Sequence, residues 1–400
     1  MKRRVVAVSL GWLGISMVND AIPAVVLPHQ LLSSGQADAT TLGVVTLLAI
    51  ALAAAVQPIA GAWSDAVGRW PVIAAGVVVG IVGLLLMLAP ETALPGAVIG
   101  LLGVSAAQAG HQPLLPEFIP TPWRGQASGV KSALDVSGAI IGFLLLAALL
   151  GSGAPVAAVV LLAALMAAPF AIAYLVLPTS RRARSHESPR ILFRGPLPGG
   201  LLPLIVARFF FLLGIYAVGR FLLLFVSERL RLPPDAAAEQ AGLALALLAG
   251  ITVVASLPAG WLADRVGRRA LMVAGGALAA IGIGLLPSAG SMPSILAFGA
   301  LMALGTAAFN VASWAALSDM TAAADTGRLL GLANFGTAGA AAAAGAFGLL
   351  IDAGNAGGGA SGYLLAFEIA AACTLLSGAL AWKLALRLPT ASLIPAEVPR

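Results

Sequence analysis

Six charged residues interrupt long apolar stretches of the sequence: Asp20, Lys131, Asp135, Arg208, Arg220 and Glu368. A charge near the middle of a membrane costs at least about 2.5–3.5 kcal/mol on insertion scales, so each one invites a functional hypothesis. Carboxylates in such positions can carry protons, and arginines can bind anionic groups. This set of residues indicates solute binding and proton transfer.

Two acidic residues of the first half are candidates for a proton site. Asp20 follows Asn19, also a candidate, and Asp135 lies one helical turn after Lys131. Burial favours the neutral form of a carboxylate, whereas a nearby ammonium group favours its ionised form. Competition between these effects would serve proton coupling. The alternative is a static Lys131–Asp135 pair that only neutralises itself.

In the second half, Arg220 and Tyr216 share one helical face. Arg220 could bind an anionic substrate group, or it could pair with Asp20 and close the outer side. Arg208 lies closer to the end of its apolar stretch and is expected to snorkel toward water. Both roles of Arg220 remain open at this stage.

Uncharged polar side chains add to the candidates, namely Gln108, His111 and Gln112 in one apolar stretch and Asn310 and Trp314 in another. Amides that face a cavity would hydrogen-bond a polar substrate, and Trp314 could stack on an apolar face. The alternative is hydrogen bonding between helices, worth typically about 0.6 kcal/mol per contact.

The elements that carry these residues are membrane-spanning helices. Sixty per cent of the residues are hydrophobic and 10% are charged, against about 25% charged in soluble domains. Twelve spans of about 20 residues fit the chain, so we expect an all-α polytopic membrane protein. The spans are predicted at 5–27, 41–62, 70–89, 95–115, 127–150, 155–177, 201–226, 240–263, 270–287, 293–316, 328–351 and 361–386.

The loops predict the orientation of these spans, because Lys and Arg concentrate on the cytoplasmic side. If the N-terminus is cytoplasmic, only Arg229 and Arg231 fall in outer loops. We therefore expect both termini in the cytoplasm and a multi-pass protein of the inner (plasma) membrane. A signal peptide at the N-terminus is the less favoured alternative. The positive net charge of +6 follows from this distribution, so no nucleic-acid partner is expected.

One motif occurs twice, half a chain apart. Gly61, Asp65, Gly68 and Arg69 recur in the same spacing as Gly260, Asp264, Gly267 and Arg268, each set between two predicted spans. The repeat predicts two six-helix bundles with the same topology, related by an axis along the membrane normal. We assign 1–177 to the N-terminal bundle, 178–198 to a basic cytoplasmic linker, and 199–400 to the C-terminal bundle with a short tail.

The twin motif, the six-plus-six topology and the basic linker resemble the major facilitator superfamily over essentially the whole chain. The resemblance implies that helices 1, 4, 7 and 10 line a central cavity and that span 12, with Glu368, is peripheral. It also implies a cytoplasmic gate in which Arg69 pairs with Glu117 and Arg268 with Asp319. In that gate Asp65 lies against the start of span 11, and Asp264 against the start of span 5.

Together these features predict a secondary active transporter that moves a small solute by alternating access. The solute is expected to be a polar or anionic metabolite, with a sugar among the candidates, and the coupling ion a proton. Export of amphipathic compounds is the alternative. It is the less favoured one, because the fifth span lacks the proline signature of the family's drug-antiporter branch. A transport-inactive membrane sensor or assembly protein is the alternative of another class.

No nucleotide-binding loop, zinc signature or nucleophile elbow accompanies the spans. The glycine-rich segment 357–362 formally fits a dinucleotide pattern, but it follows no strand and falls in an outer loop. We therefore expect no enzyme activity, no cofactor and no metal. The expected partners are the lipid bilayer, the solute and protons, with the chain acting as a monomer.

Overall fold

The computed structural model describes residues 2–35, 38–120, 123–177, 197, 199–320, 326–356 and 361–383. Within these residues, 12 helices are long and apolar enough to cross a membrane. The all-α fold with twelve spans is thus confirmed. Nearly all of the predicted linker 178–198, and residues 357–360 of the glycine-rich segment, lie outside the described residues.

The N-terminal half contains the first six spans. Its elements are α1 (Lys2–Ala21), η1 (Ile22–Val26), α2 (Leu27–Ser33), α3 (Ala39–Val67), α4 (Arg69–Leu86), η2 (Pro90–Thr92), α5 (Ala93–His111), α6 (Leu114–Phe118), α7 (Arg124–Gly151) and α8 (Pro155–Val176). The first span runs through α1, a π-helical turn at η1 and α2. It reaches Ser33, beyond the predicted edge at residue 27, because hydropathy detects only the apolar part of a helix.

The C-terminal half repeats this arrangement. Its elements are α9 (Leu201–Leu230), α10 (Pro234–Val266), α11 (Arg268–Leu285), η4 (Leu286–Ser288), α12 (Met292–Met320), α13 (Thr326–Ala343), η5 (Ala344–Ala346), α14 (Phe347–Asn355) and α15 (Ser361–Lys383). Proline lies inside α3 at Pro58 and inside α10 at Pro258. A proline inside a helix removes one backbone hydrogen bond and allows a bend.

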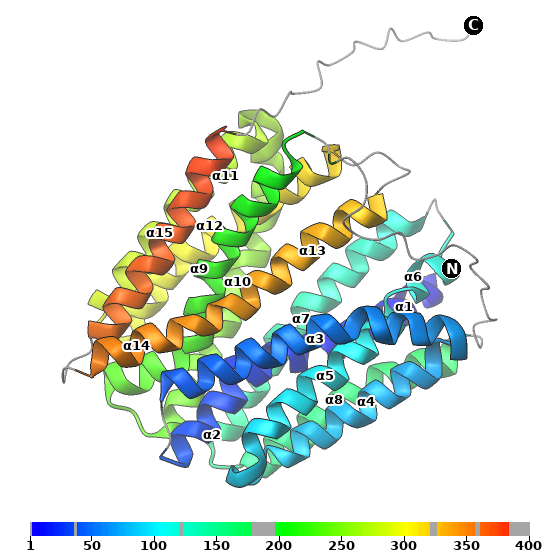
Figure 1. The fold of residues 1–400 in the computed structure, drawn as a ribbon, viewed down its shortest axis with the longest axis horizontal. Helices are drawn as coiled ribbons and strands as arrows, with labels where there is room; N and C mark the ends of the chain where they lie inside the picture. The colour runs from blue at the N-terminus through cyan, green and yellow to red at the C-terminus, as the bar shows by residue number, and fades with distance from the viewer. Residues whose placement is uncertain are drawn as a thin grey trace, which may run out of the picture.

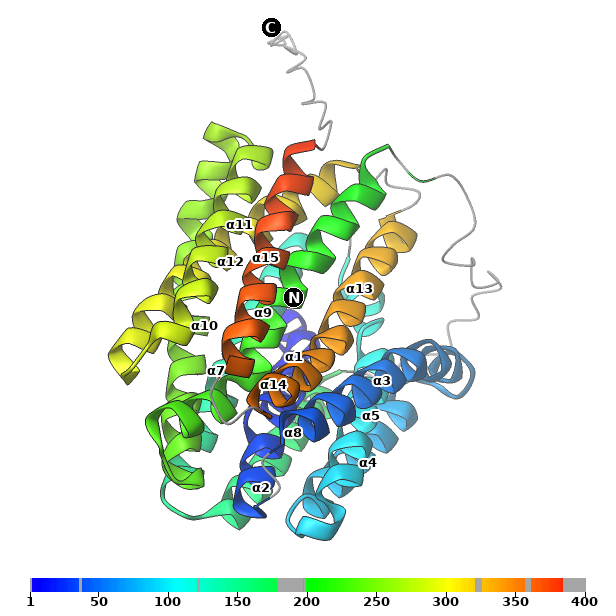
Figure 2. The same ribbon diagram turned by 60° about the vertical axis from the view of Figure 1, so that its left-hand side comes forward.

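The two halves converge at one end and diverge at the other. Helix α3 runs beside α13 and α14 where its N-terminus begins, and it separates from α13 toward its own C-terminus (Figure 1). A view turned by 60° shows α10, α11 and α12 on one side of the molecule and α3, α4 and α5 on the other (Figure 2). We call the end with Gly68 and Gly267 the motif end, and the end with Ala39 and Asp352 the opposite end.

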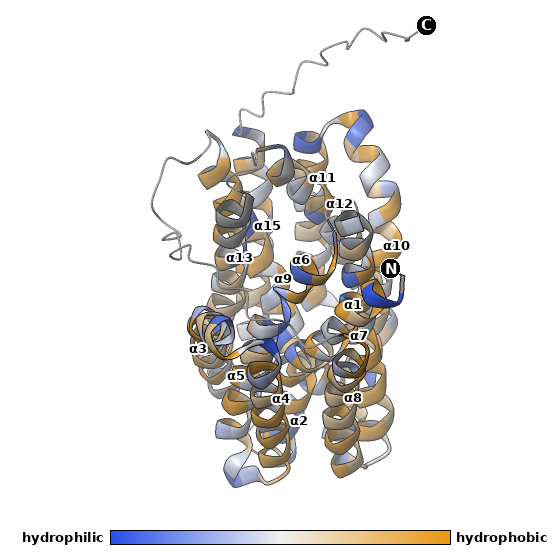
Figure 3. Cartoon of the chain, turned by 90° about the vertical axis from the view of Figure 1, so that its right-hand side faces the viewer, coloured by the Kyte–Doolittle hydropathy of each residue, from blue (hydrophilic) through white to orange (hydrophobic). Residues whose placement is uncertain are grey.

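The surface of the bundles suits a lipid environment. Hydrophobic residues cover most of the length of the helices (Figure 3), and large apolar side chains such as Leu175, Leu257 and Val254 are exposed. Inside each bundle, small residues allow close helix packing, since a Cβ added to Gly83 would overlap the backbone of Gly100. Such contacts replace the hydrophobic effect, which does not join helices within lipid.

Candidate functional site

The second glycine of each motif copy is required by the backbone. Gly68 alone separates α3 from α4, and Gly267 alone separates α10 from α11. Their φ/ψ values are 103°/158° and 89°/143°, a region that is essentially accessible only to glycine. Each motif therefore forms a one-residue turn between two spans.

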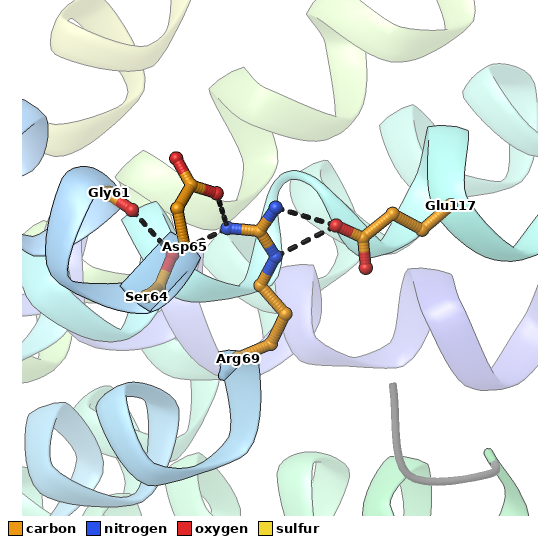
Figure 4. Close-up of polar contacts among 5 residues, drawn as sticks. All are labelled: Gly61, Ser64, Asp65, Arg69 and Glu117. Carbon is orange, nitrogen blue, oxygen red and sulfur yellow. Dashed lines mark hydrogen bonds and ion pairs between the residues drawn. The ribbon is translucent and has the colours of Figure 1, made fainter. Parts of the chain in front are cut away.

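The arginine of the first copy organises a polar cluster at this turn (Figure 4). Arg69 donates to one oxygen of Glu117 through Nε at 2.8 Å and through Nη2 at 2.6 Å. Its Nη1 donates to Ser64 Oγ at 2.7 Å and to the Asp65 carboxylate. The cluster joins α3, α4 and α6, so it fastens three elements of the N-terminal half.

The second copy forms a corresponding contact in the C-terminal half. Arg268 pairs with Asp319 and donates from Nη1 to the carbonyl oxygen of Ala315 at 2.7 Å. The arginine–carboxylate pairs that the family resemblance implied are thus present in both halves. Each pair stays within its own half.

The described part of the motif end is exposed around both motif copies. Asp65 and Asp264 are exposed. A Cβ added to Gly61 would meet nothing within 4 Å, and one on Gly260 would meet only Val311 at 3.9 Å. The expected neighbours of the two aspartates involve the side chains of 326–331 and 124–126, which lie outside those the structure describes.

The opposite end carries hydrogen bonds between the halves. The Asp352 carboxylate of α14 accepts from the backbone N–H of Ala39 at 3.1 Å and of Thr40 at 2.6 Å. These N–H groups begin α3, where the helix dipole favours a negative charge. Asp38, from the same half as α3, caps the same helix by accepting from Thr41 N at 2.5 Å.

Two further features join the halves at the opposite end. His29 Nε2 lies 2.8 Å from Asp235 Oδ1, which connects α2 with the start of α10. Packing is also close, because a Cβ added to Gly43 would overlap the carbonyl oxygen of Gly345. Asp352, His29 and Asp235 carry no local signal in the sequence, since only the fold brings them to their partners.

Lys131 and Asp135 form a half-buried cluster in the N-terminal half. Lys131 Nζ lies 3.6 Å from Asp135 Oδ2 and 3.7 Å from the centre of the Trp12 ring. Ser16 of α1 donates to the same aspartate. The cluster joins α7 to α1, so the pair has partners beyond its own helix.

Asp20 lies within electrostatic range of this cluster and of Tyr216 in the C-terminal half. It is partly exposed, next to the exposed Asn19, and lies within electrostatic range of Asp135. Tyr216 of α9 is within such range of four charged groups: Asp20, Asp135, Arg208 and Arg220. The central charges of both halves thus share one region.

Arg220 is 5% exposed and donates from Nη1 to Thr46 Oγ1 of α3 at 2.9 Å. Among the described side chains no ion pair joins it to Asp20. The expected alternative, an Asp20–Arg220 pair that closes the outer side, is therefore absent from this conformation. A neutral hydroxyl contacts the guanidinium instead.

Arg208 does not snorkel, contrary to expectation. It is 4% exposed, donates to Ser313 of α12, and its guanidinium carbon lies 4.4 Å from the centre of the Trp314 ring. Packing against α12 holds the side chain inside the bundle. Arg208 lies two and three times four residues before Tyr216 and Arg220, so the three residues belong to one row of i±4 positions along α9.

The remaining uncharged candidates are spread over several environments. His111 is 1% exposed and contacts Phe170 edge-on, with ring centres 5.3 Å apart. Gln112 is exposed, whereas Gln108 and Asn310 are partly buried. Glu368 is exposed on α15. Within the described ranges, no group of three or more His, Cys, Asp or Glu side chains is placed to hold a metal ion.

A known protein family matches the sequence of both halves of the chain. The family model described as Major Facilitator Superfamily matches residues 8–249 and 204–400. No curated protein sequence matches the chain. At the level of sequence, the chain therefore matches the family model and not an individual curated protein.

Solved structures share the fold at low sequence identity. A bacterial homologue of the human lysosomal transporter Spinster, inward-facing and occupied, has a TM-score of 0.75 at 15% identity and covers 95% of this chain and 96% of its own. The D-xylose-proton symporter gives 0.70 at 18%, covering 95% and 97%. The nucleoside transporter NupG gives 0.70 at 15%, covering 95% and 98%. The chain belongs to the major facilitator superfamily and is a multi-pass secondary transporter, not an enzyme.

Proposed function

We propose that the chain moves a small polar or anionic solute across the inner membrane by alternating access, driven by protons. The observation that carries this proposal is the asymmetry between the two ends. Described hydrogen bonds join the halves at the opposite end through Asp352 and Asp235. At the motif end, the described pairs of Arg69 and Arg268 stay within single halves.

This asymmetry is what one state of an alternating-access cycle requires. In the other state the contacts at the opposite end would break, and Asp65 and Asp264 would meet the other half at the motif end. We assign residues 1–177 and 199–400 as the two moving bodies and 178–198 as their linker. The Spinster homologue, whose structure is described as inward-facing, is similar in fold.

The positive-inside distribution supports an orientation for this state. Basic residues concentrate in the loops of the motif end, and Arg229 and Arg231 occupy the opposite end. We therefore assign the motif end to the cytoplasm, together with both termini. The conformation would then open inward and be closed toward the outside.

Asp20 is our candidate for the proton carrier. Unlike Asp135, it has no ion-pair partner among the described residues. Asp20 lies within electrostatic range of the Asp135 carboxylate, and two like charges at such range repel each other. A proton on Asp20 would relieve that repulsion. The D-xylose-proton symporter, by its name, moves a sugar with protons and has a similar fold.

The proposal is tested with purified protein in liposomes. We expect uptake of at least one sugar, nucleoside or organic acid that saturates with concentration, accelerates with an imposed proton gradient and stops with a protonophore. The matched control is Glu368→Gln, a carboxylate of α15 outside the central region. Solute binding without flux would contradict transport and favour a sensor, whereas flux restricted to amphipathic compounds would favour the efflux alternative.

A further inference from the structure

Two guanidinium groups lie in the interior of the C-terminal half with only neutral partners among the described side chains. Arg208 and Arg220 are 4% and 5% exposed. Neither forms an ion pair among the described residues. In each, the Nε–H is buried without a hydrogen-bond partner. A buried charge normally has a counter-charge, because removal from water is costly.

The neutral partners do not replace a counter-charge. Arg208 contacts the Ser313 hydroxyl and the Trp314 ring, and Arg220 contacts the Thr46 hydroxyl. Hydroxyl oxygens and aromatic faces supply partial negative charge only. Each guanidinium keeps donors that match a carboxylate or phosphate group.

The central charges of the two halves leave a positive excess. Lys131 and Asp135 form their own pair. Besides Asp135 of that pair, the charged groups within electrostatic range of Tyr216 are Asp20, Arg208 and Arg220. The excess is one positive charge when Asp20 is ionised and two when it carries a proton. A bound anion would reduce this excess.

We propose that Arg208 and Arg220, which lie about 18 Å apart along α9, offer two successive positions for the acidic group of the transported solute, which is a small organic anion with a carboxylate or phosphate group. This rests on the proposed transport function and specifies its substrate class. Asn310 lies one turn before Ser313 on α12, and its buried Oδ1 has no partner. It provides an acceptor for a hydroxyl or amide of the same solute.

The two arginines have different roles because their partners differ. Every described contact of Arg208 lies within the C-terminal half, so its site stays intact while the halves move. The Arg220–Thr46 hydrogen bond joins α9 to α3 across the halves. An anion that takes the Nη1 donor from Thr46 removes one of the contacts that hold the opposite end closed. Substrate binding then favours opening at that end.

The experiment compares anions with neutral solutes of similar size. Thermal unfolding of the detergent-purified protein is followed with inorganic phosphate, succinate, benzoate and glucose 6-phosphate, and in parallel with glucose, xylose and uridine. We expect at least one organic anion to raise the Tm and to be transported in liposomes, while the neutral solutes have no effect. A separate arm adds phosphatidylglycerol to the micelles to test an anionic lipid headgroup.

Variants then connect the effect to the two side chains. Arg208→Gln and Arg220→Gln should each weaken binding of the stabilising anion about tenfold or more, as loss of a charge-assisted hydrogen bond predicts. Arg208→Lys, which keeps the charge, should weaken it less. The matched control is Arg229→Gln, an exposed arginine on the same helix that donates to the Ala289 carbonyl oxygen, and it should bind normally.

The outcomes separate this inference from the proposed function. Proton-driven flux of a neutral solute, unaffected by Arg208→Gln and Arg220→Gln, would overturn the anion site and leave the transport function standing. Absence of flux for every solute, in protein whose unfolding remains cooperative, would contradict the transport function itself. Stabilisation by phosphatidylglycerol alone, or by none of the anions, would overturn the assignment of a soluble anionic substrate.

Discussion

Replacing Asp352 should open the end of the molecule at which the two halves meet. Its carboxylate accepts two backbone N–H groups at the start of α3, from Ala39 and Thr40. Loss of a helix cap costs about 0.5–2 kcal/mol, and a hydrogen bond to a charged group contributes about 1.5–3 kcal/mol. With Asp352 half-buried, we expect about 2 kcal/mol for Asp352→Ala, which shifts the ratio of closed to open conformers roughly 30-fold.

The matched control is Asp38→Ala, because Asp38 caps the same helix from within its own half. It should lower the Tm to a similar extent without favouring either conformer. Nitroxide labels on the exposed residues Glu91 and Ser291, in a Cys373→Ser background, report the separation of the halves at this end. We expect longer label distances for Asp352→Ala than for Asp38→Ala. Equal distance distributions for the two variants would refute the reasoning.

Three further predictions concern packing, the motif pair and the proton site. Gly43→Ala places a Cβ on the carbonyl of the facing glycine, so the same labels should move apart, whereas Gly219→Ala, with nothing within 4 Å, should leave them in place. Arg69→Glu and Glu117→Arg should each slow transport, and their combination should recover part of it; a double variant no better than the single ones would contradict the ion pair. Asp20→Asn should abolish proton-driven accumulation while exchange of internal for external solute continues, and accumulation at the original level would exclude Asp20 as the proton carrier.

The architecture was predictable because its signals are local in sequence. Hydropathy located all twelve spans, and a motif repeated half a chain later revealed the duplication. Gly68 and Gly267, which belong to that motif, have the positive φ that a turn of one residue requires. The pairs of Arg69 with Glu117 and of Arg268 with Asp319 came from the family resemblance and are present in the structure.

The contacts between the halves were not predictable in the same way. Asp352 and Ala39 are far apart in the chain, and neither belongs to a repeated motif. Whether Arg208 snorkels or packs inward depends on Trp314 and Ser313, which only the packing of α12 against α9 brings into reach. The sequence left open an ion pair between Asp20 and Arg220. In this conformation the Arg220 guanidinium donates a hydrogen bond to the Thr46 hydroxyl instead.

The prolines inside α3 and α10 bear on how the protein could avoid a pathway that is open at both ends at once. Pro58 lies between Gly43, which packs against the other half, and the motif turn at Gly68; Pro258 has the corresponding place in α10. Since the backbone can bend at these points, the motif end could approach the other half before the opposite end separates. In the proposed cycle, such bending would allow an occluded intermediate between the two open states, closed at both ends of the molecule. If these helices were straight, each half would move as a rigid body. One end of the molecule would then open at the moment when the other end closed.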